Sequence, residues 1–173
     1  MIGDRPALRT IGRMDLDELP PAHFGFPGPL RDRLVAAILS GGKTSTSSLL
    51  LEYERENEPL PQAGQRRAVV DSDGRRVAAI EVTEIRLVRL ADVDRQHVLD
   101  EGEGHETVAQ WRADHEAFWH SAEMRAALGD LGFTVNDDTQ VVAERFRLAC
   151  RGDAGSARSR RPRGAACRRS SVT

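Results

Sequence analysis

Lysine occurs once in this chain, at position 43, and the other 24 of its 25 basic residues are arginine. The lysine amine is compact and can lose its proton, whereas a guanidinium stays charged and cannot act as a base at ordinary pH. GC-rich coding would replace lysine by arginine wherever the two are interchangeable. We therefore interpret Lys43 as a position where arginine does not serve. The alternative is that one lysine remained by chance.

Lys43 stands in a polar loop, Gly41-Gly42-Lys43-Thr44-Ser45-Thr46, whose Gly-Lys-Thr sequence is also found in phosphate-binding P-loops. A P-loop needs a glycine five residues before Gly42, and Ala37 stands there. A P-loop also follows a strand and opens a helix, whereas this loop follows a predicted helix. Hydrolysis of a nucleoside triphosphate is therefore not expected.

A second candidate is the acidic run Asp100-Glu101-Gly102-Glu103-Gly104. Most runs of this kind are solvated turns. Glycine also lets a backbone approach a ligand closely, and it would let Glu103 turn toward Lys43 without the constraints of a helix. The spacing alone does not choose between these two interpretations.

Two His-Glu pairs, His105-Glu106 and His115-Glu116, invite comparison with zinc proteases. The second histidine that each pair would need is replaced, by Ala109 and by Trp119, and the two cysteines have no metal-ligand spacing. We expect no metal and no other cofactor, and interpret the histidines as packing or surface residues.

These candidate site residues lie on a mixed series of predicted helices and strands. Prolines before position 30, apolar residues at helical spacing and the Gly41-Gly42 stop predict a helix just before the lysine loop. The turn Asp71-Ser72-Asp73-Gly74 predicts a hairpin between strands at 68–70 and 77–90. Further predicted elements are a strand at 48–53, a short helix from Asp92 to Leu99, helices at 106–120 and 123–128, and a strand at 140–149.

The order of these elements predicts an α+β domain with a curved antiparallel or mixed sheet, because helices and strands do not alternate as they do in Rossmann-type folds. In the long strand the apolar face changes from Ile80 and Val82 to Ile85 and Leu87, which predicts a bulge. We divide the chain into an N-terminal segment at 1–23, a domain at 24–149 and an arginine-rich tail at 150–173 without apolar periodicity, predicted to be disordered.

Composition and charge limit which binding partners and which cellular location are expected for this chain. Net charge is −2, but residues 151–173 hold seven arginines and one acid, so the remainder is acidic and RNA contact needs a local basic patch. No stretch is apolar enough to span a membrane, and no signal peptide is evident. Two cysteines argue against a disulfide framework and favour a reducing, cytoplasmic location. The sequence does not indicate an oligomeric state.

Four segments resemble successive blocks of ASCH-domain proteins, which belong to the PUA-like superfamily. They read FGFPGPLRDRLVAAILSGGKTSTSSLL, AAIEVTEIRLVRLADVD, DEGEGHETVAQWRADHEAFW and TQVVAERFRLA, and span about residues 24–149. The most specific piece is the G-x-K-x-x-T loop at 41–46. The block made by Glu101 to Gly104 with Trp111, Arg112 and His115 supports it.

The resemblance implies a PUA-like small β-barrel flanked by helices, with a cleft beside the lysine loop. Family members are associated with RNA binding; some are amidohydrolases that deacylate N4-acetylcytidine, and others are reported as ribonucleases. Carried over from the amidohydrolases, the catalytic residues are Lys43, Thr46 and Glu103, with Glu101 as the alternative acid. Thr46 would attack the acyl carbonyl, a desolvated Lys43 would act as base, and the acid would shuttle the proton.

Two other functions remain open: a ribonuclease whose lysine stabilises charge on phosphate, and a non-catalytic RNA reader in which Glu103 accepts from a cytosine amino group. The partner expected in each case is RNA or a modified nucleoside. Phe24, Phe26 and Tyr53 are candidates for stacking on a base, whereas Trp111, Phe118 and Trp119 are expected in the core. The other expected binding residues are Thr44, Ser45, Glu101 and Arg112.

Overall fold

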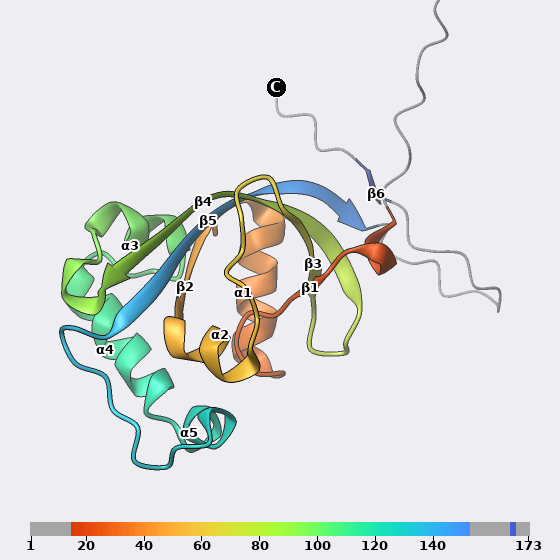
Figure 1. Cartoon of the computed structure of the whole chain (residues 1–173). Helices are drawn as coiled ribbons and strands as arrows, with labels where there is room; N and C mark the ends of the chain where they lie inside the picture. Colours follow the sequence, from red (N-terminus) through yellow and green to blue (C-terminus); the bar gives the residue numbers. More distant parts are fainter. Residues whose placement is uncertain (1–14, 153–166, 169–173) are drawn as a thin grey trace, which may run out of the picture.

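The computed structural model of the chain describes residues 15–152 and 167–168. In these residues the chain forms a curved sheet with helices at its concave side and at one end (Figure 1). The strands are β1 (Pro21–Ala22), β2 (Ser45–Leu49), β3 (Arg66–Val70), β4 (Arg76–Arg89), β5 (Gln140–Gly152) and β6 (Cys167–Arg168). The helices are α1 (Pro29–Ser40), α2 (Leu50–Glu56), α3 (Arg95–Glu101), α4 (Val108–Trp119) and α5 (Ala122–Leu128), with short 3-10 helices at Leu16–Glu18 and Leu90–Asp92.

The strands pair in the order β1-β3-β4-β5-β2, and β6 pairs with the end of β5. Among the strands of the described residues, only the β1–β3 pair is parallel, and the other pairs are antiparallel. The predicted α+β class is therefore confirmed. Within the described residues no pairing joins β1 to β2, so the sheet is open and the barrel is not confirmed.

The long strands β4 and β5 arch side by side across the molecule (Figure 1). Their pairing shifts register between Ala79 and Ile80 and again between Val82 and Glu84, so the predicted bulge is confirmed. The apolar face differs from the prediction, because Leu87 is 49% exposed while Val88 packs against the core. A bulge changes which residues point inward, and the alternation used for the prediction did not place it correctly.

The predicted helix before the lysine loop is α1. Pro29 stands in its first turn, where a missing N–H costs nothing. The helix ends at Gly41, whose φ of 83° is left-handed and therefore favours glycine. The amides of Gly42 and Lys43 then both donate to the carbonyl of Ala37, which turns the chain toward β2.

The predicted strand at 48–53 is wrong. Strand β2 runs from Ser45 to Leu49, and the chain becomes helical at Leu50. The carboxylate of Glu52 accepts from the amide of Leu49 at 2.7 Å and so satisfies a free donor at the start of α2. An apolar run of three leucines does not distinguish a strand from a buried helix turn, and this hydrogen bond decides between them.

The other helices lie close to their predicted positions, with one cap displaced. Asp94, not Asp92, caps α3 by accepting from the amide of His97. Thr107 and Gln110 form the predicted capping box of α4. Helices α3, α4 and α5 gather at the β2 end of the sheet (Figure 1). No helix in the described part of the chain is long and apolar enough to cross a membrane.

Two apolar clusters form the main core. One joins α4 and α5 to the ends of β2 and β5 around Trp111 and Trp119, and the other joins α1 to the middle of the sheet around Ile38 and Ile80. At the end of β5, Cys150 is disulfide-bonded, so the cysteine pattern does not by itself indicate a reducing compartment. Most of the predicted tail, 153–166 and 169–173, lies outside the described residues.

Candidate functional site

Lys43 lies inside the protein with only 1% of its surface exposed. Its Nζ donates to Glu103 Oε1 at 2.6 Å and to the backbone carbonyl of Glu101 at 3.3 Å. Glu101 Oε2 lies 3.7 Å from the same nitrogen. A buried ammonium is tolerated when carboxylates and hydrogen bonds compensate for lost water. Lys43 is thus a buried donor held between an acid at the end of α3 and an acid in the loop that follows it.

Glu101 is fully buried and is the centre of a polar cluster. Its Oε1 accepts from Ser47 Oγ at 2.7 Å and lies 3.2 Å from His97 Nε2, while its Oε2 lies 3.3 Å from His115 Nε2. Burial acts to raise the pKa of Glu101, but Lys43 and the two histidines outweigh it. The pKa of Glu101 therefore lies well below its ordinary value, and the group is a carboxylate.

The lysine loop and the acidic loop meet through glycine backbones. Gly102 has a φ of 65°, and a Cβ placed on it would lie 2.0 Å from the carbonyl oxygen of Gly42. Next to this contact the amide of Thr44 donates to the carbonyl of Asp100 at 2.7 Å. Glycine at 102 is therefore required for Lys43 and Glu103 to meet.

A cavity of about 780 Å³ opens beside this pair. It is bounded by the edge strand β2, by residues of α1, α2, α4 and α5, and by the loop at 102–105. Glu103, whose side chain is 19% exposed, lines the cavity, whereas Lys43 does not. The volume is in the range of small-molecule sites. Because Glu103 lines the cavity, it is the residue of the pair that a ligand would contact.

A sequence model described as the ASCH domain matches residues 22–149. The chain belongs to the ASCH domain family. No curated protein matches it.

Two solved structures resemble this ASCH domain. The ASCH domain of Lactobacillus crispatus JV V101 is 26% identical, with a TM-score of 0.64 over 75% of this chain and 78% of that one. A protein of Enterococcus faecalis V583 is 28% identical, with a TM-score of 0.63 over 73% of each chain.

The structure places the predicted catalytic residues of this ASCH domain at one site, but they do not all touch. Lys43 and Glu103 are bonded, and Thr46 lines the same cavity. Within the described residues the hydroxyl of Thr46 makes no hydrogen bond to Lys43 or Glu103, whereas the neighbouring Ser45 and Ser47 bond to residues of α3.

The predicted binding residues are more scattered. Thr44 Oγ1 donates to the carbonyl of Asp100, and Ser45 is fully buried and donates to the carbonyl of His97. Phe24 lines the cavity but is a core residue, packed edge-on against Phe146. Tyr53 and Arg112 do not line the cavity, and Arg112 pairs with acids on the surface.

Several site residues were missed from the sequence. His97 and His115 were interpreted as packing or surface residues, yet both contact Glu101. The i, i+4 spacing of His97 and Glu101 on α3 was a usable signal, because it predicts one helix face. Phe118, which was expected in the core, also lines the cavity, and its ring centroid lies 5.7 Å from that of Phe26, one of the predicted stacking residues.

A further acid, Glu52, lies in the cavity wall. Burial raises its pKa to about 7, against the hydrogen bond from the amide of Leu49, which lowers it.

No group of three or more His, Cys, Asp or Glu among residues 15–152 is arranged to hold a metal ion.

Proposed function

We propose that this cavity binds a cytidine-type base, as a modified nucleoside or in RNA, and hydrolyses an acyl group from its exocyclic nitrogen. One observation carries the proposal: Glu103 stands in the cavity wall, held at 2.6 Å by the buried ammonium of Lys43. Family membership supports it, since ASCH domains are generally proposed to bind RNA.

In this proposal Glu103 is the group that moves the proton. Thr46 Oγ attacks the acyl carbon and its proton passes to the Glu103 carboxylate. As the C–N bond breaks, Glu103 returns that proton to the departing cytidine nitrogen, and water then hydrolyses the ester on Thr46. Lys43 is a positioning residue here, because its Nζ already donates to Glu103 and to the backbone carbonyl of Glu101, and Lys43 does not line the cavity. General acid–base groups of this kind contribute roughly 10²–10⁴-fold to a rate.

The test is turnover of N4-acetylcytidine, free and within a short single-stranded RNA, without added metal. Glu103→Gln should lower the rate by about 10²-fold or more while folding and binding persist. Glu106→Gln removes an exposed acid three residues away and should leave the rate unchanged. A Glu103→Gln protein with the wild-type rate would eliminate this role for Glu103.

A non-catalytic reader is the second candidate, and the burial of Lys43 favours it. The ammonium is compensated by two carboxylates inside the protein, as expected for a scaffold. Glu103 would then only accept a hydrogen bond from a cytosine amino group. Tight binding without turnover, and weaker binding in Glu103→Gln, would identify the reader.

A further inference from the structure

Three arginines line the cavity, namely Arg31, Arg33 and Arg55. None of them forms an ion pair within the part of the chain that the structure describes. Nine other arginines in that part do, with acids on the surface or in the sheet. Every arginine that lines the cavity therefore lacks a carboxylate partner among the described residues.

Arg31 is the most informative of the three because it is buried, with 6% of its surface exposed. Its Nε donates to the carbonyl of Gly25 at 3.1 Å, and its Nη2 donates to the same oxygen. One carbonyl does not neutralise a guanidinium, and a buried charge without a counter-ion is costly. An anionic ligand in the cavity would supply the missing charge.

The other two arginines reach the cavity from two helices. Leu30, Arg33, Leu34 and Ala37 follow helical spacing along α1 and all line the cavity. Glu52, Arg55 and Glu56 do the same on α2. Arg33 and Arg55 are exposed, so their side chains are free to move toward a ligand.

Arginine charges also act on a histidine that lines the cavity. His23 lines it, and the pKa of His23 is lowered first by burial and then by the charges of Arg31, Arg67 and Arg76, with Glu56 opposing. Of the other cavity acids, Glu103 is paired with Lys43, Asp114 lies 2.8 Å from His105 Nε2, and burial raises the pKa of Glu52 to about 7. Glu56 is exposed, and solvent screens its charge.

We propose that Arg31, Arg33 and Arg55 form a phosphate-binding subsite, so that the occupant of the cavity is a nucleotide and not a free nucleoside. This rests on the proposed binding of a base in the same cavity. Guanidinium binds phosphate oxygens in a two-point geometry that suits this role. The subsite distinguishes nucleotides, including those in RNA, from the free modified nucleoside as the natural ligand.

Calorimetric titration of the full chain tests the subsite with four ligands: N4-acetylcytidine, its 5′- and 3′-monophosphates, and inorganic phosphate. To separate binding from turnover, the titrations use Glu103→Gln as the host. At least one monophosphate should bind about tenfold or more tightly than the nucleoside, as charge-assisted bonds to phosphate predict. Equal affinities for the nucleoside and both monophosphates would overturn the subsite, as would inorganic phosphate binding as tightly as the nucleotide.

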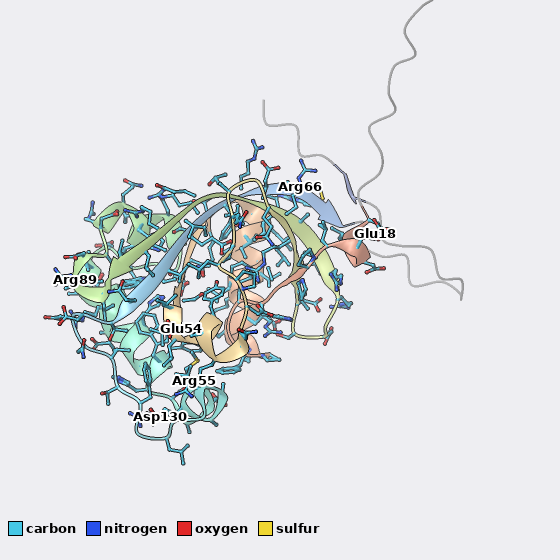
Figure 2. The ribbon with its side chains drawn as sticks, viewed as in Figure 1. Glu18, Glu54, Arg55, Arg66, Arg89 and Asp130 are labelled. Carbon is cyan, nitrogen blue, oxygen red and sulfur yellow. The ribbon has the colours of Figure 1, made fainter. Side chains whose placement is uncertain are left out.

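Arginine substitutions test which residues bind the phosphate. Arg33→Gln with Arg55→Gln should remove most of the affinity that the phosphate adds and leave the nucleoside affinity unchanged. Arg66→Gln is the matched control, since Arg66 lies on β3, distant in Figure 2 from Arg55 on α2, and pairs with Glu81 outside the cavity. Arg31→Lys keeps the charge but loses the two-point geometry, and should lower nucleotide affinity further. A preference for the nucleotide that survives all three cavity substitutions would overturn the assignment. Absence of turnover in the wild type would contradict only the hydrolase.

Discussion

At the residue scale, the structure gives a different reason for the lysine at position 43 than the sequence does. On sequence grounds alone, lysine is expected there because it can act as a base. The structure uses the amine as a hydrogen-bond donor, with Glu103 and two oxygens of Glu101 around one nitrogen. A compact ammonium presents three donors from a single point, whereas a guanidinium is planar and larger. In a site with 1% exposure, size and shape are sufficient to exclude arginine.

Removal of this charge should expose the cost of burying Glu101. Lys43→Met leaves a fully buried carboxylate without its ammonium, and we expect the free energy of unfolding at neutral pH to fall by roughly 3–5 kcal/mol. Urea denaturation measures the change. The double variant Lys43→Met/Glu101→Gln removes both charges and should recover part of the loss. A double variant less stable than the single one would show that Lys43 and Glu101 are not energetically paired.

At the element scale, the site depends on two loops whose backbones are in close contact at Gly42 and Gly102. Gly102→Ala should push the Gly42 carbonyl away and separate Lys43 from Glu103. We expect a loss of about 1–3 kcal/mol in unfolding free energy from overpacking, together with weaker ligand binding. Gly104→Ala is the control, because Gly104 also has a positive φ, of 92°, but nothing lies within 4 Å of the position that an added methyl group would take. Equal effects of the two substitutions would mean that backbone strain, not the close approach of Gly42, is responsible.

The carboxyl of Glu52, in the first turn of helix α2, has a different proton affinity in the folded and unfolded states. The pKa of Glu52 is raised from 4.5 to about 7, so the folded state holds this proton more tightly. Stability from Glu52 is therefore present below 4.5 and is lost as pH rises through about 7. The stability of wild type relative to Glu52→Gln should fall across that interval in urea titrations. Glu54→Gln, on the exposed face of the same helix (Figure 2), should show no such trend.

The elements with strong local signals could be predicted from the sequence. Thr107 and Gln110 begin α4 as expected, and the Asp71–Gly74 turn joins β3 to β4. The α2 helix could not, because its start depends on Glu52 bonding backwards to Leu49. The cluster around Glu101 depends on packing α3 against β2, which links residues about fifty positions apart. Long-range contacts of this kind leave little trace in local periodicity.

At the scale of the whole molecule, charge is distributed unevenly. Net charge is −2, yet the cavity holds three arginines that form no ion pair within the described residues, and the C-terminal residues are rich in arginine. Binding of a mononucleotide should therefore depend on the cavity, whereas a longer RNA could also contact the tail.

Salt dependence separates these contributions. Substitution of five tail arginines by glutamine (Arg158, Arg160, Arg161, Arg163 and Arg169) should make the salt dependence of single-stranded RNA affinity shallower. The logarithmic slope should fall by about 0.7 for each phosphate that the tail no longer neutralises. The affinity for a mononucleotide should not change. A parallel loss for the mononucleotide would show that the tail contributes to the cavity itself.

Both tryptophans of the chain lie on α4, on either side of His115. The ring of His115 stacks on Trp111 at 4.3 Å between centroids and meets Trp119 edge-on at 5.3 Å, and Trp119 also lines the cavity. The intrinsic fluorescence of the folded protein therefore originates beside the site. The emission should therefore respond to an occupant of the cavity, without any attached dye.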